Sequence, residues 1–186
     1  MLYRIFRPLI KLITKVFLRP KYIGLENIPN EGNIILAGNH IHNFDGFVVI
    51  SSTKRKVHFL AKKELWDGPK KIVFDNMGLI PVDRSKKDPS VLARAEAYLK
   101  KKEVIGIFPE GTTEKGRGLL PFKIGAVKMA SDTNTKIVPF VIKGKYKLFS
   151  KSLRVIFTKP IEINSNDLEK ENERLRKIIK EMLESE

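Results

Sequence analysis

One stretch decides how this chain folds: Asn33-Ile34-Ile35-Leu36-Ala37-Gly38-Asn39-His40-Ile41-His42-Asn43-Phe44-Asp45. Its first part, residues 33–37, is an apolar run typical of a buried strand. The second part places His40 and, five residues later, Asp45 just beyond the end of that strand. The apolar run at residues 47–50 then predicts the start of a helix or a second strand.

Three interpretations fit the polar residues of this stretch. In the first, His40 is a structural histidine at a strand end and Asp45 is a capping residue. In the second, His40 and His42 share one face of a strand and bind a metal ion together with Asp45. In the third, Asp45 fixes the tautomer of His40, so the other ring nitrogen is free to act as a general base toward a substrate hydroxyl. These residues alone do not decide among the three.

The composition limits the classes of protein that fit. At 186 residues the chain predicts a single domain with a core of its own. The absence of cysteine excludes disulfides, thiolate nucleophiles and cysteine-ligated zinc. The net charge of +15 predicts attraction to an anionic partner, which is nucleic acid, anionic lipid, a phosphorylated substrate or an acidic carrier protein.

Residues 1–20 predict an amphipathic, purely cationic helix that ends at Pro20 and lies in a membrane interface. They contain five basic residues and no acid, and at helical spacing the apolar side chains fall on one broad face. The apolar positions are Leu2, Ile5, Phe6, Leu9, Ile10, Leu12, Ile13, Val16 and Phe17, and the cations on the opposite face are Arg4, Arg7, Lys11, Lys15 and Arg19. No apolar run approaches the ~18 residues needed to span a bilayer, and no signal peptide is evident. We therefore expect a helix (1–20) that attaches a single domain (21–186) to the cytoplasmic face of the cell membrane as a peripheral, monotopic protein.

The rest of the chain alternates short apolar runs with helical segments, which predicts an α/β fold with a mixed, largely parallel sheet flanked by helices. Strands are expected near residues 57–61, 78–83, 103–108, 136–143 and 152–158, and helices near 89–102 and 119–130, with a final helix capped at Asn166. His40, Arg84 and Glu110 then lie at strand ends, where open α/β sheets bind ligands. The planar guanidinium of Arg84 suits a phosphate.

Four blocks in this order resemble the glycerolipid acyltransferase family, and in particular its bacterial 1-acylglycerol-3-phosphate acyltransferases. The blocks are the NHxxxxD motif at residues 39–45, Gly78 to Arg84, Phe108 to Thr112, and Val138-Pro139-Phe140. The resemblance implies the fold of that family and transfer of a fatty acyl group from acyl carrier protein or coenzyme A to the sn-2 hydroxyl of lysophosphatidic acid, giving phosphatidic acid. It implies no cofactor and no metal.

The resemblance also implies roles for individual residues. His40 is the general base and Asp45 orients it, so the hydroxyl attacks the thioester directly without a covalent acyl-enzyme. Arg84 and Lys123 contact the acceptor's phosphate, while Glu110, Gly111 and Thr112 form the acceptor-binding motif and Val138-Pro139 shapes the acyl side.

One departure from the family's pattern leaves the acceptor open. The third block commonly continues Glu-Gly-Thr-Arg-Ser, but Thr113 and Glu114 replace the last two residues here. With a cation missing from the phosphate site, another lysophospholipid or a lyso-aminolipid remains an alternative acceptor. A nucleic-acid partner is not expected, because the basic residues are not interleaved with aromatic residues in a recognisable module.

Overall fold

The computed structural model describes residues 3–68, 71–83, 85, 88–114, 116–164 and 167–185. Within these residues, seven strands form one sheet in the order β1-β7-β6-β2-β5-β3-β4. The strands are β1 (Lys21–Ile23), β2 (Ile34–Gly38), β3 (Val57–Lys62), β4 (Ile80–Val82), β5 (Val104–Ile107), β6 (Ile137–Lys143) and β7 (Arg154–Phe157). Neighbouring strands run parallel except β6 and β7, which are antiparallel. The prediction of a mixed, largely parallel sheet is confirmed.

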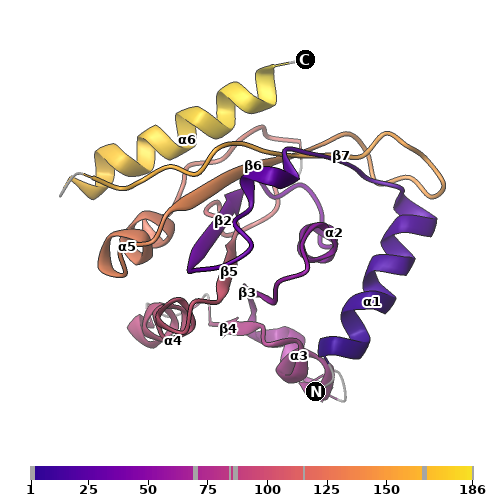
Figure 1. Ribbon diagram of the computed structural model, residues 1–186, viewed down its shortest axis with the longest axis horizontal. Helices are drawn as coiled ribbons and strands as arrows, with labels where there is room; N and C mark the ends of the chain where they lie inside the picture. The colour runs from indigo at the N-terminus through magenta and orange to yellow at the C-terminus, as the bar shows by residue number, and fades with distance from the viewer. Residues whose placement is uncertain are drawn as a thin grey trace.

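Helices cover both faces of the sheet (Figure 1). On one face lie α1 (Tyr3–Ile13) and α2 (Asp45–Ser52), and on the other α4 (Pro89–Lys100), α5 (Gly125–Asp132) and α6 (Leu168–Glu184). The remaining helical pieces are η1 (Thr14–Leu18), η2 (Leu25–Asn27), η3 (Lys63–Trp66) and α3 (Lys71–Met77). Residues 47–50 thus belong to a helix, which settles the choice left open between helix and strand.

The position of β2 in the middle of the sheet accounts for the continuous apolar run at residues 33–37. It pairs with β5 on one side and with β6 on the other. Ile34 and Leu36 point into the core beneath α2, whereas Ile35 and Ala37 point into the core beneath α5 and α6. Because both faces are covered, every residue of β2 is buried. The strand therefore delivers residue 39 and its successors to the carboxyl edge of the sheet.

The amino-terminal helix packs on α2 through one narrow side. The Arg7 guanidinium donates to the Thr53 carbonyl oxygen, and the Thr14 hydroxyl donates to the Ser51 hydroxyl over 2.9 Å. Ile10 packs against the core as well. The prediction that all the apolar positions share one face and all the cations the opposite one is therefore wrong for Ile10 and Arg7, which lie on the side that packs on α2.

The outward side of this helix is apolar. Its exposed large apolar residues, with those of η1, are Ile5, Leu9, Leu12, Ile13, Val16 and Phe17. Lys11 and Lys15 are exposed on the same segment. No helix in the described part of the chain is long and apolar enough to cross a membrane. The helix continues through the π-helical turn η1 and stops at Arg19, whose backbone adopts the left-handed conformation.

Two helix boundaries differ from the expected ones. The helix expected from residue 119 begins at Gly125, because residues 119–124 form a loop in which the Lys123 amide donates to the Pro109 carbonyl over 2.9 Å. The cap of α6 is Asp167, whose side chain accepts a hydrogen bond from the Lys170 amide. Asn166, the expected cap, lies outside the described residues.

Candidate active site

His40 and Asp45 meet at the carboxyl end of β2. Nδ1 of His40 lies 2.8 Å from Oδ2 of Asp45, which is fully buried in the first turn of α2. A carboxylate accepts hydrogen bonds only, so the ring proton is assigned to Nδ1 and Nε2 is left free to take up another proton. The expected pair is formed, and its carboxylate also lies where a helix amino terminus favours negative charge.

Three further donors hold the Asp45 carboxylate. The amides of Ile41 and His42 donate to Oδ2 over 2.7 and 2.8 Å. The Tyr146 hydroxyl donates to Oδ1 over 2.5 Å. Burial, followed by the negative charge of Asp45, raises the pKa of Tyr146, so this hydroxyl stays protonated and remains a donor. With both oxygens bonded, the carboxylate has a single orientation.

Sequence reasoning missed Tyr146. It stands in the connection from β6 to β7, and neither its spacing nor its neighbours set it apart from an ordinary surface aromatic residue. Its ring also stacks on His42, with centroids 4.2 Å apart. Only the return of β6 alongside β2 brings the connection next to Asp45.

The backbone around His40 is anchored from both sides. Asn39 is buried, and its side chain bonds both the amide and the carbonyl of Ile142 on the neighbouring strand β6, over 2.7 and 3.0 Å. The imidazole of His40 stacks on Phe108 with ring centroids 4.2 Å apart. These contacts fix the direction of the imidazole before any substrate arrives.

Glu110 is buried and bonds to the main chain. Its Oε1 accepts from the His40 amide over 2.8 Å, and its Oε2 accepts from the Leu120 amide over 2.9 Å. Burial raises the pKa of the Glu110 carboxyl, and the two amide hydrogen bonds oppose that shift. In this structure the residue expected to bind the acceptor joins the His40 loop to the loop before α5.

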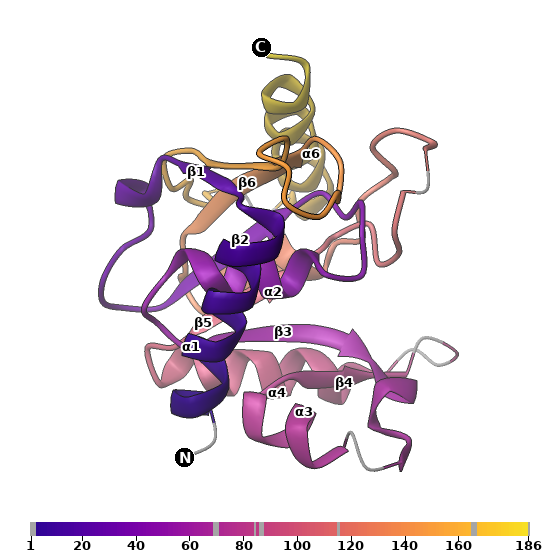
Figure 2. The ribbon, with the colours of Figure 1, turned by 90° about the vertical axis from the view of Figure 1, so that its right-hand side faces the viewer.

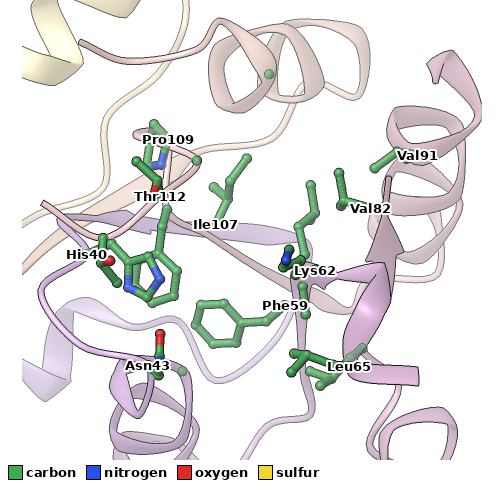
Figure 3. A pocket seen from close by; sticks show the side chains of 18 of the residues that line it. His40, Asn43, Phe59, Lys62, Leu65, Val82, Val91, Ile107, Pro109 and Thr112 are labelled. Carbon is green, nitrogen blue, oxygen red and sulfur yellow. The ribbon is translucent and has the colours of Figure 1, made fainter. Parts of the chain in front are cut away.

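A cavity of about 670 Å³ adjoins His40. Most of its walls are apolar side chains, from Phe59 and Ile107 near the middle to the region beside α4. Figure 3 shows His40, Asn43 and Thr112 at one end of the cavity and Leu65, Val82 and Val91 at the other. Polar groups lie at the His40 end, and Lys62, Asp83 and Asp88 line the cavity as well. A cavity of this size with mostly apolar walls is typical of a site for an apolar ligand with a polar head.

The polar end of the cavity includes Gly111, Thr112, Thr113 and Lys123. Gly111 adopts the left-handed conformation, with φ at 68°, and its amide donates to the Phe108 carbonyl. A Cβ atom at this position would stand 2.9 Å from Cε and 3.0 Å from Nζ of Lys123. The glycine therefore makes room for the Lys123 amine beside the cavity, which brings these expected site residues together.

Two other expectations concern Arg84 and the block Val138-Pro139. Arg84 lies outside the described residues, so its assignment to the phosphate stays a prediction. Val138 and Pro139 are buried within β6 and do not belong to the described lining of the large cavity. The walls that suit an acyl chain come from β3, β5 and α4 instead.

His42 does not join His40 in a metal site. Its Nδ1 accepts a hydrogen bond from the Phe44 amide over 3.2 Å, and its ring lies against Tyr146. Among the described residues, no three histidine or acidic side chains are grouped so as to hold a metal ion. His58, the remaining histidine, is buried and bonds the Gly78 carbonyl and Glu103, which agrees with a structural role.

Comparison with known proteins places this geometry in a family. A family model described as Acyltransferase matches residues 19–143, which include the His40–Asp45 pair, the Glu110 loop and Lys123. The chain belongs to the Acyltransferase family. The amino-terminal helix and Tyr146 fall outside the matched range of this acyltransferase.

Two curated relatives carry the name 1-acyl-sn-glycerol-3-phosphate acyltransferase. The one from Borreliella burgdorferi is 36% identical over 133 residues, which are 70% of this chain and 53% of the relative. The one from Bacillus subtilis is 29% identical over 169 residues, which are 86% of this chain and 82% of the relative. The chain thus spans about half the length of the first relative.

A solved structure shares the fold of this acyltransferase. It is the 1-acyl-sn-glycerophosphate (LPA) acyltransferase PlsC from Thermotoga maritima, with a TM-score of 0.79 and 21% identity. The match covers 98% of this chain and 80% of that one.

Proposed function

We propose that this acyltransferase moves a fatty acyl group from an acyl thioester to the free sn-2 hydroxyl of 1-acylglycerol-3-phosphate, giving phosphatidic acid. The observation that carries the proposal is the His40–Asp45 pair beside a large, mostly apolar cavity with a polar end. The names of the relatives support this choice of acceptor.

In the proposed reaction, Nε2 of His40 takes the proton from the acceptor hydroxyl as its oxygen attacks the thioester carbonyl. The Asp45 carboxylate, 2.8 Å from Nδ1, stabilises the imidazolium that forms. The tetrahedral intermediate then expels the thiolate, which recovers the proton from His40 and leaves as a thiol. No covalent acyl-enzyme is needed, and the chain has no cysteine to form one.

The acceptor's phosphate is assigned to the polar end of the cavity. Lys123 contributes an exposed ammonium there, and Thr112 contributes a hydroxyl and an amide. Arg84 is expected to add a guanidinium. The apolar walls around Phe59, Ile107 and Val91 then accommodate an acyl chain.

The membrane is proposed as the source of the acceptor. The outward apolar side of α1 suits insertion between lipid head groups, and the net charge of +15 favours an anionic surface. We place the protein on the cytoplasmic face of the cell membrane, where acyl carrier protein and acyl-coenzyme A are available. Both donors are anionic and suit the same charge.

A second candidate is the same chemistry on another lysophospholipid or a lyso-aminolipid. It is favoured by Thr113, which lines the cavity at the position where the family commonly has an arginine. A neutral side chain there removes one cation from the phosphate end.

The deciding experiment measures acyl transfer from both thioesters to lysophosphatidic acid and to other lyso-lipids. His40→Ala is expected to lower kcat by about 10²- to 10⁴-fold, because the general base is lost. His42→Phe, two positions away, is the matched control, because it keeps a ring against Tyr146 and should retain most of the activity. Transfer to another lyso-lipid alone would favour the second candidate, and equal loss in both variants would contradict the assignment of the base.

A further inference from the structure

The loop that joins β6 to β7 links the amino-terminal helix to the His40–Asp45 pair. Figure 2 shows this loop beside the carboxyl end of α1. Tyr146, near its start, donates to Asp45, while Leu148 and Phe149 at its tip are 63% and 56% exposed. Adjacent apolar residues exposed to this degree at a loop tip are typical of a surface that contacts a partner or a membrane.

The tip is held against the helix. The Phe149 amide donates to the Phe17 carbonyl over 2.6 Å, and the two rings lie 5.5 Å apart. Phe149 has φ at 58°, which is uncommon for a bulky residue and persists only when the surroundings enforce it. The Arg19 guanidinium lies 5.9 Å from its ring centroid. The contacts with Phe17 and Arg19 therefore keep an aromatic ring on the surface.

The charged residues of the loop itself are all of one sign. Lys145, Lys147 and Lys151 are exposed, and the sequence has no acidic residue from 133 to 161. None of the described carboxylates pairs with these three lysines. Exposed apolar side chains beside exposed lysines fit a bilayer surface with anionic head groups.

We propose that Leu148 and Phe149 form a second membrane contact that inserts into an anionic leaflet beside the outward side of α1. The inference rests on the proposed function, because it assumes that the acceptor comes from a membrane. Phe149 contacts Phe17 of η1, so the patch adjoins the exposed apolar residues of α1 and η1. Since Tyr146 belongs to the same loop, insertion of the tip also steadies the donor to Asp45.

Fluorescence quenching tests insertion directly. The chain has one tryptophan, so Leu148→Trp in a Trp66→Phe background reports on the loop alone. Vesicles contain phosphatidylglycerol and phosphatidylcholine in equal parts, with the phosphatidylcholine brominated on its acyl chains. We expect strong quenching and a blue shift of the emission. Lys180→Trp in the same background is the control, because α6 lies on the opposite face of the sheet from α1. Equal quenching for both variants, or none for the loop variant, would overturn the proposal.

Sedimentation with the same vesicles, unbrominated, measures the contribution to binding. Leu148→Ser with Phe149→Ser is expected to weaken binding about tenfold or more, whereas the exchange Leu148→Phe with Phe149→Leu keeps the apolar area and should preserve it. Unchanged binding by the serine variant, with slower transfer only from acyl carrier protein, would assign the patch to that protein instead. Neither measurement requires acyl transfer, so an inactive protein that inserts would refute the proposed function alone.

Discussion

The Tyr146 hydroxyl donates to Oδ1 of Asp45 over 2.5 Å, across 101 positions of sequence. It occupies the one carboxylate oxygen that the His40 loop leaves free, since Oδ2 already accepts from His40, Ile41 and His42. The orientation of Asp45, and through it of the His40 ring, therefore depends on a side chain supplied by the β6–β7 loop.

Tyr146→Phe is expected to lower kcat about tenfold and to leave the acceptor KM nearly unchanged, because a hydrogen bond to a charged group contributes roughly 1.5–3 kcal/mol. Without this donor one oxygen of Asp45 loses its hydrogen bond, so the carboxylate and the imidazole that it holds are less well oriented. Steady-state kinetics with each substrate varied in turn measure kcat and KM separately.

The control for this substitution is Tyr22→Phe. The Tyr22 hydroxyl is also partly buried and donates to the Val48 carbonyl of α2 over 2.9 Å, away from the carboxylate. Tyr22→Phe should lower stability by a similar amount and leave kcat unchanged. A Tyr146→Phe enzyme with native kcat would show that the tyrosine contributes packing alone.

Glu110 makes a prediction about stability. Its carboxyl ionises near pH 4.5 in the unfolded chain and at higher pH in the folded protein, where burial raises the pKa. Between these two values the folded state holds the proton more strongly, so the free energy of unfolding should fall as pH rises through this window. Urea unfolding at a series of pH values should show this slope for the native protein and not for Glu110→Gln.

Glu26→Gln is the matched control, because it makes the same replacement at an exposed glutamate whose charge does not act on Glu110. It should retain the slope of the native protein. Parallel curves for the native protein and Glu110→Gln would contradict the assigned shift. Glu110→Gln should also lower kcat, because an amide group cannot accept from both the His40 and Leu120 amides.

Lys123→Ala is expected to raise the KM for lysophosphatidic acid about tenfold, with a smaller effect on the KM of the thioester. The loss of one charge-assisted hydrogen bond to phosphate has this magnitude. Kinetics with each substrate varied in turn provide the measurement. Lys128→Ala, on the exposed surface of α5 where it pairs with Asp132, should leave both KM values unchanged. A larger rise for the thioester than for the acceptor would assign Lys123 to the donor.

Substitutions on the outward side of α1 should weaken membrane binding without lowering the stability of the fold. Leu9→Ser with Leu12→Ser should weaken sedimentation with anionic vesicles about tenfold or more, because two exposed apolar side chains are lost from the interface. The melting temperature should hardly change. Ile10 is next to Leu9 in the sequence but packs on the core, so Ile10→Ser should instead lower the melting temperature. If the double serine variant bound vesicles as strongly as the native protein and Ile10→Ser, the interfacial role of the helix would be refuted.

The sequence predicted most of the architecture because the signals it used are local. Continuous apolar runs in β2 and β6 predict strands that are buried on both faces. The five-residue spacing of His40 and Asp45 brings these two residues together just after β2. It could not predict which side of α1 faces outward, because Ile5 and Ile10 are equally apolar and only packing on α2 separates them.

By itself, the sequence determined the α/β class, the position of the His40–Asp45 pair at a strand end and the cationic, amphipathic start of the chain. Only the tertiary structure decided that Glu110 braces the His40 loop and that Tyr146 completes the hydrogen bonding of Asp45. These contacts join residues 70 and 101 positions apart. They arise because parallel pairing places β5 and β6 on either side of β2, and pairing between distant strands is not encoded in the spacing of neighbouring residues.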